Sequence, residues 1–199
     1  FFELNVHAPF YNKINEALMV NTDDFYLDYL NDPLLSERMD FIEDMVTDED
    51  DLLSLAVFSM VEGAVLYSAF AFLLHFQAKG KNKLKNVCSG IKFSVRDENL
   101  HSEGGAWLFN QLLEEKTEAG EMSLEKLREL NAKIRQSASQ LKEHEYAIID
   151  KIFEKGDIKG ITKQQMKDFV NHRIALCLGN LGLKVEQVEC SISGWFYEQ

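Results

Sequence analysis

Hydrophobic residues recur every three or four positions along most of this chain, as they do on one face of an amphipathic helix. Between Ser123 and Phe153 the apolar positions are Leu124, Leu127, Leu130, Ile134, Leu141, Ile148 and Ile152. Comparable patterns predict helices over 1–20, 23–30, 34–46, 47–76, 83–115 and 163–178. The segments AKGKNK (78–83) and SISGWFYEQ (191–199) are expected to be irregular. This succession of long helices predicts an all-α bundle.

Polar residues mark several of the expected helix starts. Thr22 can cap the helix that follows it, and Thr162 with Gln165 has the spacing of a capping box. Thr47-x-x-Asp50 predicts the start of the long apolar helix.

Proline and glycine interrupt two of the predicted helices. Pro9 is expected to kink the first one. Gly90, Gly104 and Gly105 lie inside the helix over 83–115, where each costs roughly 1 kcal/mol relative to alanine. We therefore expect close packing or a local distortion at these glycines.

Length and composition fit one helical domain over residues 1–199. The chain has 199 residues, of which 46% are hydrophobic and two are proline. Its formal net charge of -12 argues against a nucleic-acid partner, which would favour a basic surface. The opening FFELNVHAPFY already has a mid-helix pattern, so we expect an N-terminal segment to precede Phe1 in the intact protein.

Cysteine usage and apolar run length bear on the compartment. Cys88, Cys177 and Cys190 form no CxxC pair, which predicts reduced thiols in a cytoplasmic protein. The longest apolar stretch, 64–76, is interrupted by Ser68 and is too short to span a bilayer, so no membrane is expected.

Several histidines and tryptophans are assigned to packing. His75 ends an apolar helix, His144 lies in KEHEY, which predicts a solvated face, and His172 is expected to pack or to hydrogen-bond. Trp107 is predicted in the core and Trp195 in the packing of the tail.

The motif RDENLH, residues 96–101, carries the first candidate chemistry. Glu98 and His101 are three residues apart and share one helical face, so they could bind the same metal ion. The ExxH spacing is weak evidence alone, because an ordinary surface or core pair has the same pattern.

Two other predicted helices carry ionisable residues of the same kinds. Glu62 is the only ionisable residue between Leu52 and Tyr67, where burial is costly unless the carboxylate is paired or binds a cation. Glu3 and His7 are four residues apart and share a face. Taken singly, Glu62 also fits a hydrogen-bonded core acid, and Glu3 with His7 fits a partly exposed helix end.

Together, these helices approach the ligand set of a dinuclear metal site. Such sites use one glutamate from each of two helices and Glu-x-x-His from each of two others. Glu62 would be one lone glutamate, Glu98 with His101 one complete pair, and His7 with a nearby acid most of the other. Oxygen and imidazole ligands without thiolate favour iron or manganese.

The ordered motifs VHAPFY, MVEGAVLYSAFAF and VRDENLH resemble the radical-generating small (beta) subunit of class I ribonucleotide reductase. The similarity extends over nearly the whole chain, including FVNHRIALCLGNLGL and the WFY near its end. This resemblance implies a ferritin-like fold, a homodimer, and a complex with the catalytic large (alpha) subunit that reduces ribonucleotides.

The resemblance also implies roles for individual residues. His7, Glu62, Glu98 and His101 match metal ligands of a dinuclear iron or manganese site. Asp97 matches the acid that orients the histidine of the first ligand helix, so we expect Asp97 to hydrogen-bond His7. Two further roles concern the tyrosine that holds the stable radical: Tyr11 matches that tyrosine, and its apolar pocket would include Leu66 and Phe70.

The first ligand helix departs from the family pattern. The family has glutamate three residues before its histidine, where this chain has Leu4, and Glu3 stands one residue further back. Either a π-bulge widens the helix and Glu3 is a ligand, or the site lacks that ligand. The family's first metal-binding aspartate and its flexible C-terminal tail have no counterpart in this sequence.

Three functions follow as hypotheses. The first is the radical-generating subunit of ribonucleoside-diphosphate reductase. The second is a ferritin-like di-iron oxidase or hydroxylase, with a substrate channel beside the metals in place of a packed tyrosine. The third is a metal-free structural module, with Leu4 marking a decayed site.

Overall fold

The chain is helical throughout most of the part that the structure describes. The computed structural model describes residues 3–186, 188–192, 194 and 196, and at Glu3, Leu4 and Lys79 it describes the backbone alone. Among these residues the only β-type pairing is an isolated bridge between Ile158 and Ile161. The all-α prediction is confirmed.

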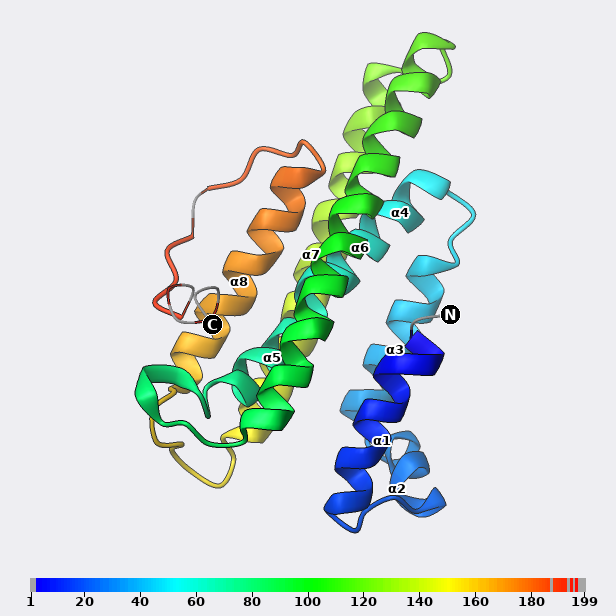
Figure 1. Ribbon diagram of the computed structural model, residues 1–199. Helices are drawn as coiled ribbons and strands as arrows, with labels where there is room; N and C mark the ends of the chain where they lie inside the picture. The colour runs from blue at the N-terminus through cyan, green and yellow to red at the C-terminus, as the bar shows by residue number, and fades with distance from the viewer. Residues whose placement is uncertain (1–2, 187, 193, 195, 197–199) are drawn as a thin grey trace.

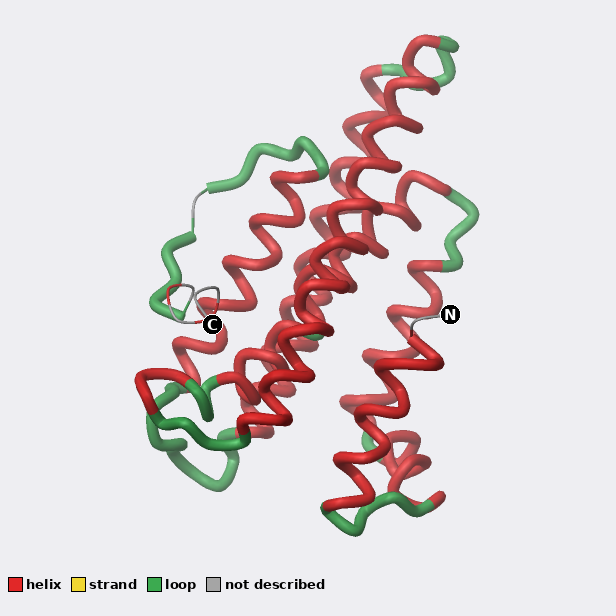
Figure 2. The backbone as a smooth tube through the Cα atoms, viewed as in Figure 1, coloured by secondary structure: helices red, strands yellow, loops and turns green. Residues whose placement is uncertain are grey.

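The α-helices are α1 Ala8–Ala17, α2 Asp23–Leu27, α3 Pro33–Val46, α4 Asp51–Met60, α5 Tyr67–Leu74, α6 Lys85–Glu118, α7 Leu124–Ile152 and α8 Lys163–Asn180. Two π-helical segments, η1 Glu3–His7 and η3 Val61–Val65, and two 3-10 segments, η2 Asp28–Asn31 and η4 Ala78–Gly80, complete the order. Figure 2 shows that helices make up most of the backbone and that loops connect them.

The apolar helix α4 packs against four other helices of the bundle. α4 contacts α3, α6, α7 and α8. In Figure 1, α1 and α3 lie on one side of the bundle and α8 lies on the other, while the joined ends of α6 and α7 project beyond the rest. Helices from both halves of the sequence therefore meet around α4.

α4, η3 and α5 form one continuous helix, 51–74, which bears on the membrane expectation. By length and composition this helix could cross a membrane, with a mean hydropathy of 1.8 in its most apolar window. The length argument based on 64–76 was therefore wrong, because the helix begins at Asp51. However, 61% of that window is buried inside the bundle, and a core helix passes the same test of length and composition.

The helix starts follow side-chain capping, with one correction. Thr22 accepts a hydrogen bond from the Phe25 backbone, and the predicted capping box at Thr162 is present. The long apolar helix is capped by Asp50, which accepts from the backbone amides of Leu52 and Leu53. The predicted start at Thr47 was wrong, since Thr47 ends α3.

Two helix glycines allow close packing, as predicted. A β-carbon at Gly90 would lie 2.1 Å from the ring of Phe10, and one at Gly105 would lie 2.9 Å from Phe58. Gly104 has no neighbour within 4 Å at that position. Gly90 thus lets α1 approach α6, whereas Gly104 has no packing role of this kind.

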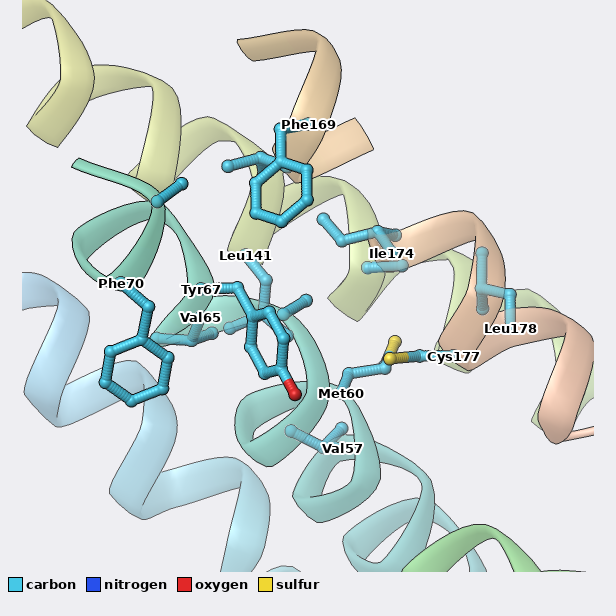
Figure 3. Close-up of a cluster of buried hydrophobic side chains, with 14 of the residues drawn as sticks. Val57, Met60, Val65, Tyr67, Phe70, Leu141, Phe169, Ile174, Cys177 and Leu178 are labelled. Atoms are coloured by element: carbon cyan, nitrogen blue, oxygen red, sulfur yellow. The ribbon is translucent and has the colours of Figure 1, made fainter. Parts of the chain in front are cut away.

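Large apolar side chains from α4, η3, α5, α7 and α8 fill the core (Figure 3). Tyr67 and Phe169 are fully buried there. Two packing predictions were wrong. Trp107 is 61% exposed, and the KEHEY segment is not a solvated face, because Glu145 is 1% exposed and His144 packs against Phe41.

The other packing residues agree with expectation where they are described. His75 is buried at the end of its apolar helix, with Nδ1 on the Phe72 carbonyl oxygen. His172 donates from Nδ1 to the Val188 carbonyl oxygen at 2.8 Å. Trp195 lies outside the described residues.

Candidate metal centre

Glu62 lies where the central helix widens. It is the second residue of the π-helical segment η3, which interrupts the α-helical bonding between α4 and α5. Single π turns of this kind occur frequently at functional sites. The next residue, Gly63, packs against α6 and α8, since a β-carbon there would lie 2.3 Å from Ser102 Oγ and 2.5 Å from Cys177 Sγ.

Glu62, Glu98 and His101 come together, and we call these three residues the ligand cluster. One potential ligand atom from each lies within 4.8 Å of the other two. His101 Nδ1 is 3.0 Å from Glu62 Oε2 and 3.0 Å from Glu98 Oε2. The ExxH pair of α6 thus meets the lone acid of η3 across the helix interface.

The electrostatics of the ligand cluster suit a cation. The side chain of Glu98 is 6% exposed and that of Glu62 is 20% exposed, so both carboxylates are largely withdrawn from water. Burial is the largest influence on the pKa of His101 and lowers it, but hydrogen bonds and charges from Glu62 and Glu98 together raise this pKa. A proton on His101 therefore neutralises the same carboxylates that a metal ion would, and the donor set fits iron or manganese.

His7 lies in a second polar group beside the ligand cluster. Its Nε2 is 3.0 Å from Asp97 Oδ2, so the predicted hydrogen bond between these residues is present. Its Nδ1 is 2.8 Å from Ser94 Oγ. Asp97 and Ser94 both project from α6, and the first of them directly precedes Glu98.

Tyr11 joins this second group. Its hydroxyl donates to Ser94 Oγ at 3.1 Å, and its ring packs edge-on against Phe10 at 5.2 Å between centroids. The ring is half-buried against the core to which Phe70 belongs and on which Leu66 also packs. The membership of Leu66 and Phe70 in a Tyr11 pocket stays a prediction.

The helix is widened before His7. A π-bulge at this place was one of the two alternatives that the sequence left open. Glu3–His7 is π-helical, and Pro9 follows as the second residue of α1. The side chains of Glu3 and Leu4 are outside the described residues, so a ligand role for Glu3 stays a prediction.

Sequence reasoning missed two residues of this region, Ser94 and Arg173. Arg173 is 4% exposed and donates from Nε to the Gly63 carbonyl oxygen at 2.7 Å. Its Nη2 is 3.3 Å from Asn99 Oδ1, and its guanidinium lies 3.8 Å from the centre of the Tyr67 ring. Arg173 therefore ties α8 to the neighbours of Glu62 and Glu98. The signal that could have identified Arg173 was the presence of a charged residue inside the apolar run FVNHRIALCLGNLGL.

A carboxylate–imidazole cluster inside a bundle of long helices defines a helical protein with a candidate metal site. The model of the family "Ribonucleotide reductase, small chain" matches residues 1–186. The chain therefore belongs to the ribonucleotide reductase small-chain family.

Curated relatives support the same family. Over 125 residues the chain is 29% identical to the "Probable ribonucleoside-diphosphate reductase small subunit 048L" of Invertebrate iridescent virus 3. The aligned region covers 62% of this chain and 31% of the relative. Over 113 residues it is 28% identical to the ribonucleoside-diphosphate reductase small subunit of Saimiriine herpesvirus 2, covering 54% of this chain and 36% of the relative. The matched regions thus span about a third of each curated relative.

A solved structure supports the fold. The dimanganese(II) NrdF of Streptococcus sanguinis superposes with a TM-score of 0.78 at 22% identity, covering 96% of this chain and 64% of that chain. The predicted ferritin-like fold is confirmed.

Proposed function

We propose that this chain forms the metal- and radical-bearing part of a ribonucleoside-diphosphate reductase small subunit. The observation that carries the proposal is the convergence of Glu62, Glu98 and His101 from two helices of a chain in this family. A core acid without function would need no second carboxylate and no imidazole at the same point.

The residues that would hold a dinuclear iron or manganese centre fall into two groups. Glu62, Glu98 and His101 would hold one ion, and His7, with Glu3 as a further candidate, would contribute to the other. A bound centre of this kind supplies one-electron oxidation chemistry when it reacts with an oxygen species. The bundle excludes water from Glu98, which is 4% exposed, and so strengthens its interaction with a cation.

Tyr11 would be the residue that holds the radical. Its ring packs against the core, and its hydroxyl points to Ser94, which in turn contacts His7. Asp97 would hold the His7 imidazole in one tautomer through Nε2. These contacts bring the phenol close to a candidate ligand and leave its ring half-buried against the core.

Assembly and location belong to the same proposal. We expect a homodimer and a complex with the catalytic large subunit, with ribonucleotides reduced on that subunit. An exposed apolar stripe on α6, formed by Phe93, Leu100 and Trp107 at intervals of seven residues, supports helix packing between copies. The buried thiols of Cys88 and Cys177 support a reducing, cytoplasmic environment.

The oxidase or hydroxylase alternative uses the same fold differently. It needs a substrate channel where Tyr11 now packs against Phe10 and hydrogen-bonds to Ser94. This contact favours the radical function. A metal-free structural module is disfavoured, because it gives no reason for two carboxylates and an imidazole from two helices to converge at one point.

The decisive experiment uses the full-length protein loaded with iron or manganese and exposed to oxygen. We expect two metal ions per chain, a tyrosyl electron paramagnetic resonance signal, and ribonucleotide reduction when the large subunit is added. A protein that binds two metals, gives no tyrosyl signal and oxidises an added hydrocarbon would favour the oxidase. A protein that binds no metal would favour the structural module.

A further inference from the structure

Four side chains form a continuous hydrogen-bonded chain beside the ligand cluster. Tyr11 Oη is 3.1 Å from Ser94 Oγ, Ser94 Oγ is 2.8 Å from His7 Nδ1, and His7 Nε2 is 3.0 Å from Asp97 Oδ2. Tyr11 and His7 belong to the N-terminal helix, whereas Ser94 and Asp97 belong to α6. The Ser94 hydroxyl is the link between Tyr11 and His7.

The chemistry of the groups gives this chain a direction. A carboxylate only accepts hydrogen bonds, so the proton of a neutral His7 lies on Nε2, which donates to Asp97. His7 Nδ1 then carries a lone pair and accepts from the Ser94 hydroxyl. A serine oxygen also accepts, and it takes the hydrogen of the Tyr11 phenol.

Burial makes each link costly to lose. Ser94 is 1% exposed and His7 is 4% exposed. A buried hydroxyl or imidazole nitrogen that loses its hydrogen-bond partner destabilises the folded state. Because the Ser94 hydroxyl is hydrogen-bonded to both Tyr11 and His7, it fixes the orientations of these two side chains together.

The helix face that carries Ser94 is built to receive the N-terminal helix. Gly90, Ser94 and Asp97 are spaced four and three residues apart and so lie on one face of α6. Gly90 admits the Phe10 ring, Ser94 meets Tyr11 and His7, and Asp97 meets His7. Ser94 lies between the packing contact at Gly90 and the His7–Asp97 hydrogen bond.

We propose that Ser94 is a positioning residue that, before a metal ion takes the lone pair of His7 Nδ1, holds the Tyr11 phenol and the His7 imidazole in one fixed arrangement. This inference deepens the proposed function and rests on it for the role of Tyr11. An apolar residue at position 94 would leave both the phenol and His7 Nδ1 without this partner.

A hydrolytic role for the same residues does not fit. Ser94, His7 and Asp97 have the residue types of a serine hydrolase triad. A nucleophile must be reached by substrate, whereas Ser94 is 1% exposed and its oxygen accepts from Tyr11. The arrangement is therefore suited to holding a phenol.

The first test needs no metal. In full-length, metal-free protein labelled with ¹⁵N-histidine and with ¹³C at tyrosine Cζ, Ser94→Ala should shift His7 Nδ1 toward the resonance of a lone pair without a hydrogen bond. It should also move the Tyr11 Cζ resonance. Ser94→Thr, which keeps the hydroxyl, should restore both shifts. Ser137→Ala, a buried serine on α7 that contacts Met45, should leave both unchanged. Parent shifts in Ser94→Ala would overturn the proposal.

The second test uses the radical. In the loaded protein a metal ion would take the lone pair of His7 Nδ1, and the Tyr11 radical has lost its phenolic hydrogen, so the Ser94 hydroxyl can donate to the phenoxyl oxygen. The Tyr11 signal should then carry a proton hyperfine coupling that disappears on transfer to D₂O, and Ser94→Ala should lack this coupling. Persistence of the coupling in Ser94→Ala would overturn the radical part of the proposal. If neither the parent nor any variant forms a radical, the proposed function fails. The histidine and tyrosine chemical shifts still decide whether Ser94 links Tyr11 and His7.

Discussion

Glu62 Oε2 and His101 Nδ1 lie 3.0 Å apart although 39 positions separate them in the sequence. The contact joins the widened part of the central helix to α6, and Glu98 reaches the same imidazole nitrogen from within α6. One nitrogen between two carboxylates is a poor arrangement without a positive charge. Each of the three side chains should therefore matter for cation binding.

Removal of the Glu62 carboxylate should abolish one metal position. Glu62→Ala leaves the apolar helix without another acid to replace it, so bound iron or manganese should fall by about one ion per chain, as measured by elemental analysis. Glu103→Ala, which removes an exposed acid from α6, should bind metal as the parent does. Full metal content in Glu62→Ala would identify Glu62 as a core acid only.

Tyr11→Phe should remove the tyrosyl signal while preserving the fold. The variant loses one half-buried hydrogen bond to Ser94, which should lower the free energy of unfolding by about 1 kcal/mol. Electron paramagnetic resonance on oxygen-treated protein and urea denaturation measure the two effects. Tyr67→Phe is the matched control, because the Tyr67 hydroxyl is bonded to the Val95 carbonyl oxygen. A signal present in Tyr11→Phe and lost in Tyr67→Phe would assign the radical to Tyr67.

Arg173→Met should destabilise the protein and disturb metal binding together. It leaves the Gly63 carbonyl oxygen without its buried donor and removes the guanidinium from the Tyr67 ring. We expect a loss of about 2–4 kcal/mol in unfolding free energy. Because Gly63 follows Glu62, metal affinity measured under folding conditions should also fall. Arg128→Met, at an exposed position of α7, should change neither quantity.

Glu145 should make stability depend on pH. Burial raises its pKa to about 7 from 4.5, against the opposing charge of Arg38 and the hydrogen bond from Ser68. The folded state thus holds a proton that the unfolded state releases, and stability falls as pH rises from about 4.5 to 7. The change should amount to at most about 3 kcal/mol.

Glu145→Gln is the variant that checks this pH dependence. It should flatten the part of the stability curve between these pH values, as measured by urea denaturation. Loss of the Arg38 ion pair, 3.3 Å in the parent, lowers the curve without adding a slope. The same slope in the parent and in Glu145→Gln would place the titrating group elsewhere.

Gly90→Ala should displace the N-terminal helix. The new methyl group would lie 2.1 Å from the Phe10 ring, so α1 must move, and the His7–Asp97 and Tyr11–Ser94 contacts should weaken with it. Gly104→Ala is the control in the same helix, where the methyl group meets nothing within 4 Å and should stabilise the protein by up to about 1 kcal/mol. In thermal denaturation, Gly90→Ala should lower the melting temperature and Gly104→Ala should raise it.

The sequence was informative where chemistry and helical periodicity coincide. The i, i+3 spacing of Glu98 and His101 and the isolation of Glu62 in an apolar helix, taken together with the ligand pattern of dinuclear sites, predicted that these three side chains meet. Ser94 was not predictable, because a serine in an amphipathic helix has no distinctive spacing and its role depends on which helix packs against it. The role of Arg173 was not predictable either, because it depends on the Gly63 carbonyl oxygen, which lies on another helix.

Some errors came from competition between local signals. Thr47 and Asp50 can both cap a helix, and Asp50 does so because α3 continues to Val46. Trp107 is apolar and lies in a helix otherwise partly buried, yet it points outward with Phe93 and Leu100. Side-chain type alone could not assign it to a core or to a surface between molecules.

The π-helical segment at Val61–Val65 has a consequence for the phase of the central helix. A π turn accommodates one more residue than an α turn, so the residues after it are rotated relative to the positions that they would have in an uninterrupted α-helix. Straightening this segment into an α-helix without removing a residue would turn α5 by about 100° about its axis, whereas deleting one residue would keep the phase of α5. After such straightening Tyr67 and Phe70 would leave the interior, and the residues before them, Leu66 and Ala69, would take their places. The extra residue beside Glu62 therefore determines which side chains of α5 face the core.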